Sequence, residues 1–110
     1  MIGEGQGMNT PRPFETRVDP DGVVWLSGEL DMATADPFSQ TVLSNVDGQQ
    51  LVLDLSGLTF VDSMGIRAIL QLARARQEAV VLRNLRPNVR RVLAVAGVDE
   101  TMGVRIEPET

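Results

Sequence analysis

The segment Leu51–Leu70, LVLDLSGLTFVDSMGIRAIL, gives the clearest structural signal in the chain. Its first residues, Leu51–Leu55, form a short apolar run bounded by turn residues, which is typical of a buried central strand. From Ile66 onward, apolar side chains recur at helical spacing and polar side chains fall on the opposite face. The residues between should form a short loop that ends in DSMG (Asp62–Gly65), where the helix begins. This segment therefore predicts a strand–loop–helix unit with the Ser63 hydroxyl at the exposed N-terminus of the helix.

A β-hairpin and a helix are expected before this unit. Phe14–Val18 alternates apolar and polar side chains, Val23–Leu26 is a compact apolar run, and the sequence DPDG (Asp19–Gly22) between them is strong turn chemistry. Thr34 can then cap a helix that extends to about Asn45. The apolar face of this helix should contain Phe38, Val42 and Val46.

A strand, a helix and a short edge strand are expected after the central unit. Val80–Leu82 is apolar and predicts the next strand. Pro87 suits the first turn of a helix, and Gly97 suits its end. The buried stripe of that helix should comprise Val89, Val92, Leu93 and Ala96. A last alternating group predicts the edge strand and consists of Met102, Val104 and Ile106.

Strands that alternate with helices predict an α/β fold. The order β-β-α-β-α-β-α-β favours a mixed, mostly parallel β-sheet with helices packed on it and right-handed crossovers between parallel strands. A chain of 110 residues suits one domain with a modest core, and we place this domain at residues 13–107. Residues 1–12 are rich in glycine and polar side chains, so we expect them to form a disordered N-terminal extension.

The composition argues against most enzymatic chemistry. The chain contains no cysteine, no histidine and no lysine. This excludes Cys/His zinc sites, thiol nucleophiles, a serine–histidine relay and a phosphate-binding loop of the lysine-containing type. We therefore expect no catalytic residue and no metal site.

Charge and hydropathy narrow the choice of partners. A net charge of -5 disfavours nonspecific nucleic-acid binding, because such binding depends on releasing counterions from phosphates. No apolar run approaches the roughly 18 residues of a membrane-spanning helix, and the N-terminus has no apolar signal segment. We expect a cytoplasmic protein that neither binds nucleic acid directly nor inserts into a membrane.

The residues around Ser63 allow two roles for its hydroxyl. It can cap the helix that follows, a role worth about 1 kcal/mol, or it can accept a phosphate at an exposed helix start. Spacing alone favours the cap. It does not decide whether Asp62 or Ser63 is the formal N-cap residue.

Three separate segments share a pattern with one known family. The sequence GELD at Gly28–Asp31 precedes Thr34 where a strand enters a helix. The central apolar strand is followed by FVDSMG at Phe60–Gly65, and VAGVD at Val95–Asp99 closes the last helix. Together these segments resemble the STAS domain family of bacterial anti-sigma factor antagonists, with the resemblance extending over Phe14–Ile106.

Two features depart from that family pattern. Met64 stands where many relatives have a small residue, and residues 107–110 are too few for the further C-terminal helix that members often have. The first departure bears on how a partner would fit against the helix start.

The resemblance implies a phosphorylation-controlled binding module. In its unmodified form the chain would bind an anti-sigma factor, a serine kinase with a histidine-kinase-like ATPase fold, and so release a sigma factor. The kinase would phosphorylate Ser63 and break the complex, and a serine phosphatase would restore it. ATP belongs to the kinase, so the chain itself would need no cofactor. The partner-binding residues would be Asp31, Thr34, Asp62, Met64, Gly65, Arg67 and Gln71.

Simpler roles stay open for several of these residues. Asp31 could stabilise its own turn, Gly65 could allow a neighbouring loop to approach closely, and Arg67 could be a solvated surface residue. An alternative function within the same family is a non-catalytic scaffold subunit of a signalling or lipid-transport complex, without regulatory phosphorylation. A third alternative, a small hydrolase, is disfavoured by the missing histidine, cysteine and lysine.

Overall fold

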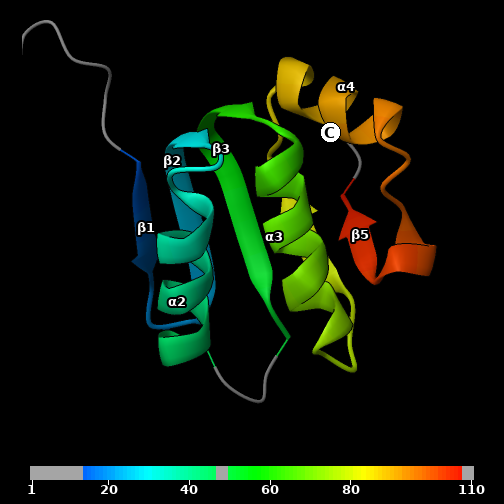
Figure 1. Ribbon diagram of the computed structural model, residues 1–110. Helices are drawn as coiled ribbons and strands as arrows, with labels where there is room; N and C mark the ends of the chain where they lie inside the picture. Colours follow the sequence, from blue (N-terminus) through cyan, green and yellow to red (C-terminus); the bar gives the residue numbers. More distant parts are fainter. Residues whose placement is uncertain (1–13, 47–49, 108–110) are drawn as a thin grey trace, which may run out of the picture.

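Strands and helices alternate along the chain in the predicted order (Figure 1). We describe them from a computed structural model for residues 14–46 and 50–107. The elements are β1 (Glu15–Val18), β2 (Val23–Leu30), α2 (Ala35–Asn45), β3 (Val52–Val61), α3 (Ser63–Arg74), β4 (Val80–Arg83), α4 (Pro87–Val95), the 3-10 turn η1 (Glu100–Met102) and β5 (Val104–Ile106). The predicted extension at residues 1–12 lies outside the described residues, so the domain boundary stays a prediction.

The strands form one five-stranded sheet in the order β1-β2-β3-β4-β5. β1 is antiparallel to β2, and every later pair of neighbours is parallel, which confirms the predicted mixed, mostly parallel sheet. The predicted turn closes the β1–β2 hairpin, because Asp19 Oδ1 accepts hydrogen bonds from the backbone N–H groups of Asp21 (2.9 Å) and Val23 (3.0 Å). Gly22 supplies the positive φ of 87° that this turn requires.

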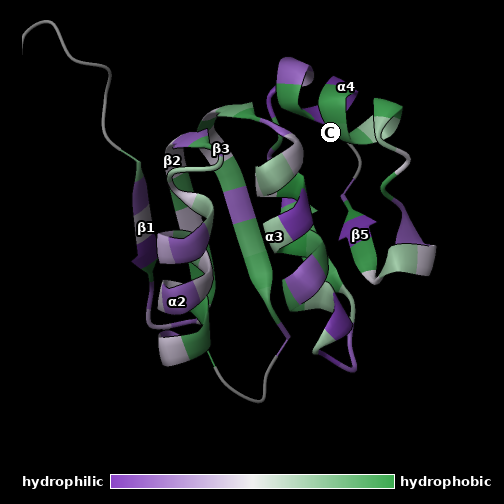
Figure 2. Ribbon diagram, viewed as in Figure 1, coloured by the Kyte–Doolittle hydropathy of each residue, from purple (hydrophilic) through white to green (hydrophobic). Residues whose placement is uncertain are grey.

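The hydrophobic core lies between the sheet and its helices. α2 and α3 lie side by side over one face of the sheet (Figure 1), and their outward turns are more polar than the apolar strand β3 behind them (Figure 2). α4 lies against the C-terminal half of β3, where Asn88 Nδ2 donates to the backbone oxygen of Thr59 (2.8 Å). The predicted apolar face of α2 is confirmed, since its three predicted residues are all buried: Phe38, Val42 and Val46.

β3 is longer than the sequence predicted. The loop expected after Leu55 is wrong, because β3 runs to Val61 and pairs with β2 along its whole C-terminal half. Two register shifts, which we call the bulges of β3, interrupt this pairing. Each adds one residue to β3 relative to β2. The buried apolar residues that β3 turns toward the helices are consequently Leu53, Leu55, Leu58 and Val61. The last three of these residues are spaced three positions apart rather than two. The sequence therefore does not show the strict alternation by which a strand is usually predicted.

α4 buries a narrower stripe than predicted. Val89 and Leu93 are buried, but Val92 is 37% exposed and Ala96 lies exposed beyond the last helical residue. The helix is short and contacts the rest of the domain along one line of side chains. One apolar residue per turn fills that contact, so the remaining two predicted core residues face outward.

The final strand also begins later than predicted. Met102 is part of η1 rather than of the edge strand, and β5 contains only Val104–Ile106. The cause is local, because the side chain of Asp99 accepts a hydrogen bond from the backbone N–H of Thr101 (3.0 Å) and starts a tight turn. Gly103 ends that turn with a φ of 82°.

A row of polar and aromatic side chains crosses the sheet on the face away from Leu53. The strand register aligns Arg17, Trp25, Asp54 and Arg83 from β1 to β4. The guanidinium carbons of both arginines lie over the Trp25 ring, at 5.2 and 5.6 Å from its centroid. This is the geometry of a cation–π contact, so the row ties together strands that are distant in the sequence.

Asp54 is the fully buried member of this row, with a relative exposure of 0%. Its carboxylate accepts hydrogen bonds from Arg83 Nε (3.1 Å), Asn84 Nδ2 (2.8 Å) and the backbone N–H of Ser56 (3.0 Å). Burial by itself raises the pKa of this carboxyl group, but the hydrogen bonds from Ser56, Asn84 and Arg83 outweigh burial and hold the pKa below its ordinary value. Asp54 is therefore a buried charge that is stabilised by hydrogen bonds from neighbouring groups.

Candidate partner-binding site

The predicted site residues gather where β2 and β3 end. Leu30 pairs with Val61 at the last register position of these parallel strands, and the backbone N–H of Asp62 donates to the Leu30 oxygen (3.2 Å). The β2–α2 loop and the start of α3 therefore emerge next to each other at one end of the sheet (Figure 1). This arrangement brings Asp31 and Ser63 to the same sheet end, as the order of strands and helices predicted.

Asp62, not Ser63, caps α3. The Asp62 side chain accepts hydrogen bonds through Oδ1 from the backbone N–H groups of Met64 (2.9 Å) and Gly65 (3.0 Å). Ser63 is the first helical residue and is exposed. Among the described residues, nothing forms a hydrogen bond with its hydroxyl. The structure thus identifies Asp62 as the cap. The Ser63 hydroxyl holds no other described residue in place.

Asp31 and Thr34 form a closed network within the β2–α2 loop. Asp31 Oδ1 accepts from the backbone N–H groups of Ala33 (3.0 Å) and Thr34 (3.2 Å). Thr34 occupies the N-cap position, but its side chain makes no cap hydrogen bond. Instead, Thr34 Oγ1 donates to the backbone oxygen of Glu29 (2.9 Å) and accepts from the backbone N–H of Asp31 (2.9 Å). Both side chains fix the loop, which favours the simpler interpretation of Asp31 as a turn-stabilising residue.

Gly65 is buried and serves the packing of α3 on the sheet. A Cβ at this position would lie 2.5 Å from the backbone oxygen of Leu30 and 2.8 Å from Val61 Cγ2. Only glycine allows the first turn of α3 to approach the end of β2 this closely. Gly65 therefore positions Ser63 and Met64 rather than offering a surface of its own.

Three exposed apolar side chains lie at this end of the sheet, and two of them were not named individually as binding residues from the sequence. Met32 in the β2–α2 loop is 74% exposed and Phe60 near the end of β3 is 45% exposed. Met64, which was predicted, is 38% exposed in the first turn of α3. We call these three residues the apolar rim. Large apolar side chains next to turn residues were the available signal, but the sequence alone does not show that Phe60 faces outward, because this depends on the bulges in β3.

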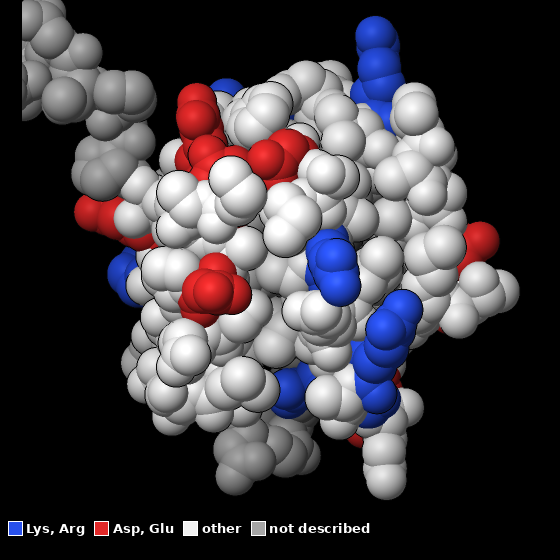
Figure 3. Space-filling view, in the orientation of Figure 1, with Lys and Arg blue, Asp and Glu red and all other residues white. Residues whose placement is uncertain are grey.

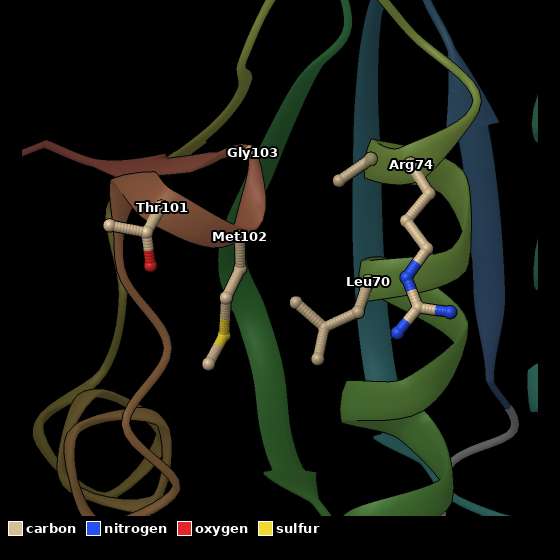
Figure 4. A pocket seen from close by; sticks show the side chains of 6 residues that line it. Leu70, Arg74, Thr101, Met102 and Gly103 are labelled. Carbon is tan, nitrogen blue, oxygen red and sulfur yellow. The ribbon is translucent and has the colours of Figure 1, made fainter.

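The outer face of α3 is hollowed along its length. A hollow of about 300 Å³ begins at Ser63, and its lining includes Arg67, Gln71 and Arg74. A second hollow of about 460 Å³ lies between α3 and η1, where Met102 and Leu70 point toward each other and Arg74 extends along the helix (Figure 4). The two hollows share Leu70 and Arg74. Arg67 and Gln71, predicted as contact residues, thus line a depression that starts at Ser63.

Charge is distributed unevenly over this surface. Acidic side chains gather over the α2 side of the molecule, whereas basic side chains follow α3 (Figure 3). The acidic residues of the β2–α2 region include Glu29, Asp31 and Asp36, and the basic residues on α3 are Arg67 and Arg74. Ser63 is the first residue of α3, so a negative charge added there would lie on the helix that carries these two arginines.

The described part of the chain contains neither a candidate metal site nor a candidate membrane-spanning helix. Within residues 14–46 and 50–107, no cluster of three or more aspartate, glutamate, histidine or cysteine side chains could hold a metal ion. No helix in the same ranges has the length and apolar character needed to cross a membrane. The described features of this sheet end are the apolar rim, exposed charged side chains and the exposed Ser63 side chain.

Comparison with known proteins identifies the family. A family model described as "Mlab, STAS domain" matches residues 14–106. The chain therefore belongs to the STAS domain family, and the resemblance seen in the sequence is confirmed. The putative anti-sigma factor antagonist BtrV of Bordetella bronchiseptica is 31% identical over 86 residues, which cover 74% of this chain and 74% of BtrV.

Solved structures show the same fold. The crystal structure of an anti-sigma factor antagonist from Mycobacterium paratuberculosis matches with a TM-score of 0.74 and 31% identity, covering 91% of this chain and 90% of that one. The anti-sigma factor antagonist SpoIIAA in its unphosphorylated form matches with a TM-score of 0.56 and 21% identity, covering 89% and 90%. At the latter identity the likeness extends to the fold alone.

Proposed function

We propose that this protein is an anti-sigma factor antagonist that acts as a phosphorylation-controlled binding switch. In its unmodified form it binds a cognate anti-sigma factor, a serine kinase with a histidine-kinase-like ATPase fold, and a sigma factor is released. Phosphorylation of Ser63 by that kinase ends the interaction, and a serine phosphatase restores it. Two relatives at 31% identity, both described as anti-sigma factor antagonists, support this assignment.

The observation on which the switch depends is the environment of the Ser63 hydroxyl. It is exposed at the first position of α3, while Asp62 satisfies the N–H groups of the first turn. A kinase can therefore reach the hydroxyl without opening the fold, and modification removes no hydrogen bond between the described residues. Phosphorylation would add about 1.5 to 2 negative charges at neutral pH at a site that is already compatible with an anion.

The effect on a complex would be much larger than the effect on folding. A phosphate buried in a contact surface without a matching cation costs several kcal/mol, because its hydration is lost. Each 1.4 kcal/mol weakens binding about tenfold. A loss of affinity of about a hundredfold or more is therefore expected, while the unfolding free energy changes little.

The proposed contact surface combines direct contacts and supporting residues. The apolar rim and the exposed polar side chains of Arg67 and Gln71 would touch the partner. Asp31, Thr34 and Asp62 would act by holding the loop and the helix start in place, in keeping with their hydrogen bonds. Burial of the rim would supply part of the binding energy, since apolar area removed from water contributes roughly 25 cal/mol per Å².

A kinase assay tests the proposal. The protein is incubated with the candidate anti-sigma factor kinase and ATP, and the phosphate is located by mass spectrometry. We expect it on Ser63, with no phosphate incorporated into Ser63→Ala and normal incorporation into Ser44→Ala, whose serine is exposed on α2. Phosphate on another residue, or none, would contradict the switch and leave the scaffold alternative.

A calorimetric titration with the same partner tests the charge mechanism. Ser63→Ala should bind as tightly as the unmodified protein, whereas Ser63→Asp should bind less tightly because it adds a negative charge to the contact surface. Indistinguishable dissociation constants for the two variants would rule the mechanism out.

A further inference from the structure

An arginine follows the proposed phosphorylation site by one helical turn. Ser63 begins α3 and Arg67 lies four residues later, a spacing that makes the two side chains neighbours on the helix surface. Both residues line the same hollow of about 300 Å³. The hollow therefore places a cation next to the position where a phosphate would be attached.

Arg67 has no charge partner among the residues that the structure describes. It is exposed, and within the described residues no hydrogen bond or ion pair engages its guanidinium group. Arg74, which lines the same hollow, is likewise unpaired in that part of the chain. A cation near the start of a helix is disfavoured by the helix dipole. The dipole of α3 therefore does not stabilise the charge of Arg67.

The acidic groups near Ser63 do not neutralise Arg67. Asp62 turns Oδ1 toward the N–H groups of Met64 and Gly65. On the neighbouring β2–α2 loop, Asp31 turns its Oδ1 toward the loop backbone, and Glu29 is exposed at the end of β2. All three carboxylates would oppose a phosphate on Ser63, whereas Arg67 is the first cation along α3 that can stabilise it.

We propose that the phosphate on Ser63 folds back onto Arg67 and forms an intramolecular phosphoserine–arginine pair in this hollow. This inference rests on the proposed phosphorylation of Ser63. The planar guanidinium group can donate two parallel hydrogen bonds to phosphate oxygens. An anion four residues before a cation is also the favourable order along a helix. Arg74 lies eleven residues after Ser63 and contributes positive potential from a greater distance.

The pair would give phosphorylation a second effect on the contact surface. A partner meeting the unmodified protein finds a free arginine on α3, whereas a partner meeting the phosphorylated protein finds that arginine occupied. One modification thus adds an anion and withdraws a cation. Loss of a favourable contact and gain of an unfavourable one would then act together on the same complex.

The test uses the full chain with phosphoserine inserted at position 63 during translation, so no kinase is needed. The second pKa of the phosphate is measured by ³¹P NMR as a function of pH. Arg67 stabilises the dianion and should lower this pKa, so Arg67→Gln should raise it by about half a unit, a shift on the scale of a single surface ion pair. Equal values in the two proteins would overturn the pair.

Two further variants separate a direct contact from a general change in charge. Arg74→Gln removes the same charge from the same hollow but should shift the pKa by less than half as much. Arg67→Lys keeps the charge without the planar fork and should give an intermediate value. Equal shifts for Arg67→Gln and Arg74→Gln would show only a diffuse field and would also contradict the pair.

The proposed function and the proposed pair can fail independently. Because the phosphate is inserted without a kinase, the ³¹P result does not depend on whether an anti-sigma factor kinase recognises Ser63. That recognition is decided by the mass-spectrometric assay. Arg67 is exposed, so its variants should fold normally, and circular dichroism of each phosphorylated protein at pH 7 checks this.

Discussion

Asp54 and Asp62 are both hydrogen-bonded carboxylates, but they belong to regions with opposite relations to the fold. Asp54 is buried on the sheet, and its partners come from β3, β4 and the residue after β4. Asp62 lies at the sheet end, and its partners are the N–H groups of Met64 and Gly65 in the helix that it caps. The first carboxylate connects distant segments, whereas the second organises a local turn.

This difference shows where the protein can tolerate a change of charge. The charge of Asp54 is part of the folded interior, so altering it should change stability. A charge at Ser63 would lie outside all structural hydrogen bonds of the described residues, so adding it should change binding instead. The following substitutions test this contrast, beginning with the largest expected effect.

Asp54→Ala should destabilise the fold most, by about 2–4 kcal/mol. It leaves the Asn84 amide and the Ser56 N–H without their acceptor and removes the ion-pair partner of Arg83. Urea unfolding followed by circular dichroism measures the loss. Asp36→Ala, which removes an exposed carboxylate from the first turn of α2, is the matched control and should cost less than about 1 kcal/mol. Similar losses for both would remove the distinction between the two regions.

Gly65→Ala should come next, with a loss of about 1–3 kcal/mol from overpacking. The added methyl group would approach the Leu30 backbone oxygen, which cannot rotate away. Gly97→Ala is an instructive comparison, because nothing lies within 4 Å of its Cβ position and only the positive φ of 76° opposes the substitution. Thermal unfolding should rank Gly65→Ala as the more harmful change. The opposite ranking would mean that α3 moves away from β2 at little cost.

Acid should weaken the fold through Asp54. Its pKa in the folded protein lies below the ordinary value of 3.8, so the folded state binds fewer protons than the unfolded state near that pH. The stability that this carboxylate contributes is present above about pH 4 and is lost as the pH falls through the folded pKa. Comparing urea midpoints at pH 6 and pH 3 should show a larger acid loss in the unmodified protein than in Asp54→Asn. Identical losses would exclude Asp54 as the source.

Asp62→Ala should have a moderate effect of about 1 kcal/mol, which is typical for an N-cap residue. The N–H groups of Met64 and Gly65 would then be left to solvent. Asp62→Asn retains an acceptor oxygen and should recover most of the loss in the same unfolding experiment. A loss as large as that of Asp54→Ala would show that the sheet end is more tightly coupled to the core than its hydrogen bonds indicate.

Ser63 variants should have the smallest effect on folding. Ser63→Ala and Ser63→Asp should both stay within about 0.5 kcal/mol of the unmodified protein, because the side chain is exposed and is not the cap. Differential scanning calorimetry is sufficient to measure this. A clear destabilisation by Ser63→Asp would mean that phosphorylation acts partly through the fold.

The local signals in the sequence were sufficient for most of the architecture. The DPDG turn, the apolar run at Leu51–Leu55 and the helical spacing after Ser63 each depend on neighbouring residues, and the elements that they predicted are present. The second half of β3 was missed because its extended conformation depends on pairing with β2. Residues 56–59 look like a loop until that partner is known.

The same distinction applies to the candidate site. Asp31 and Ser63 lie at the same end of the sheet because both follow parallel strands. The sequence was therefore sufficient to predict this arrangement. The burial of Gly65, the choice of Asp62 as the cap and the outward direction of Phe60 depend on distances of a few ångströms between segments far apart in the chain. Spacing alone does not contain that information. For Arg67 the sequence left two alternatives, a partner contact and a solvated surface position, and it did not indicate the hollow that this side chain lines.

The two bulges of β3 also determine how much chain separates Asp54 from Ser63. Each extra residue reverses which side of the strand the following side chains occupy, and the second restores the original phase. Removing one residue here would exchange inside for outside across the rest of the strand, bringing Phe60 into the interior and turning Val61 toward water. Insertions and deletions in this stretch should therefore be far more damaging than most substitutions, even though its composition resembles that of a tolerant surface loop.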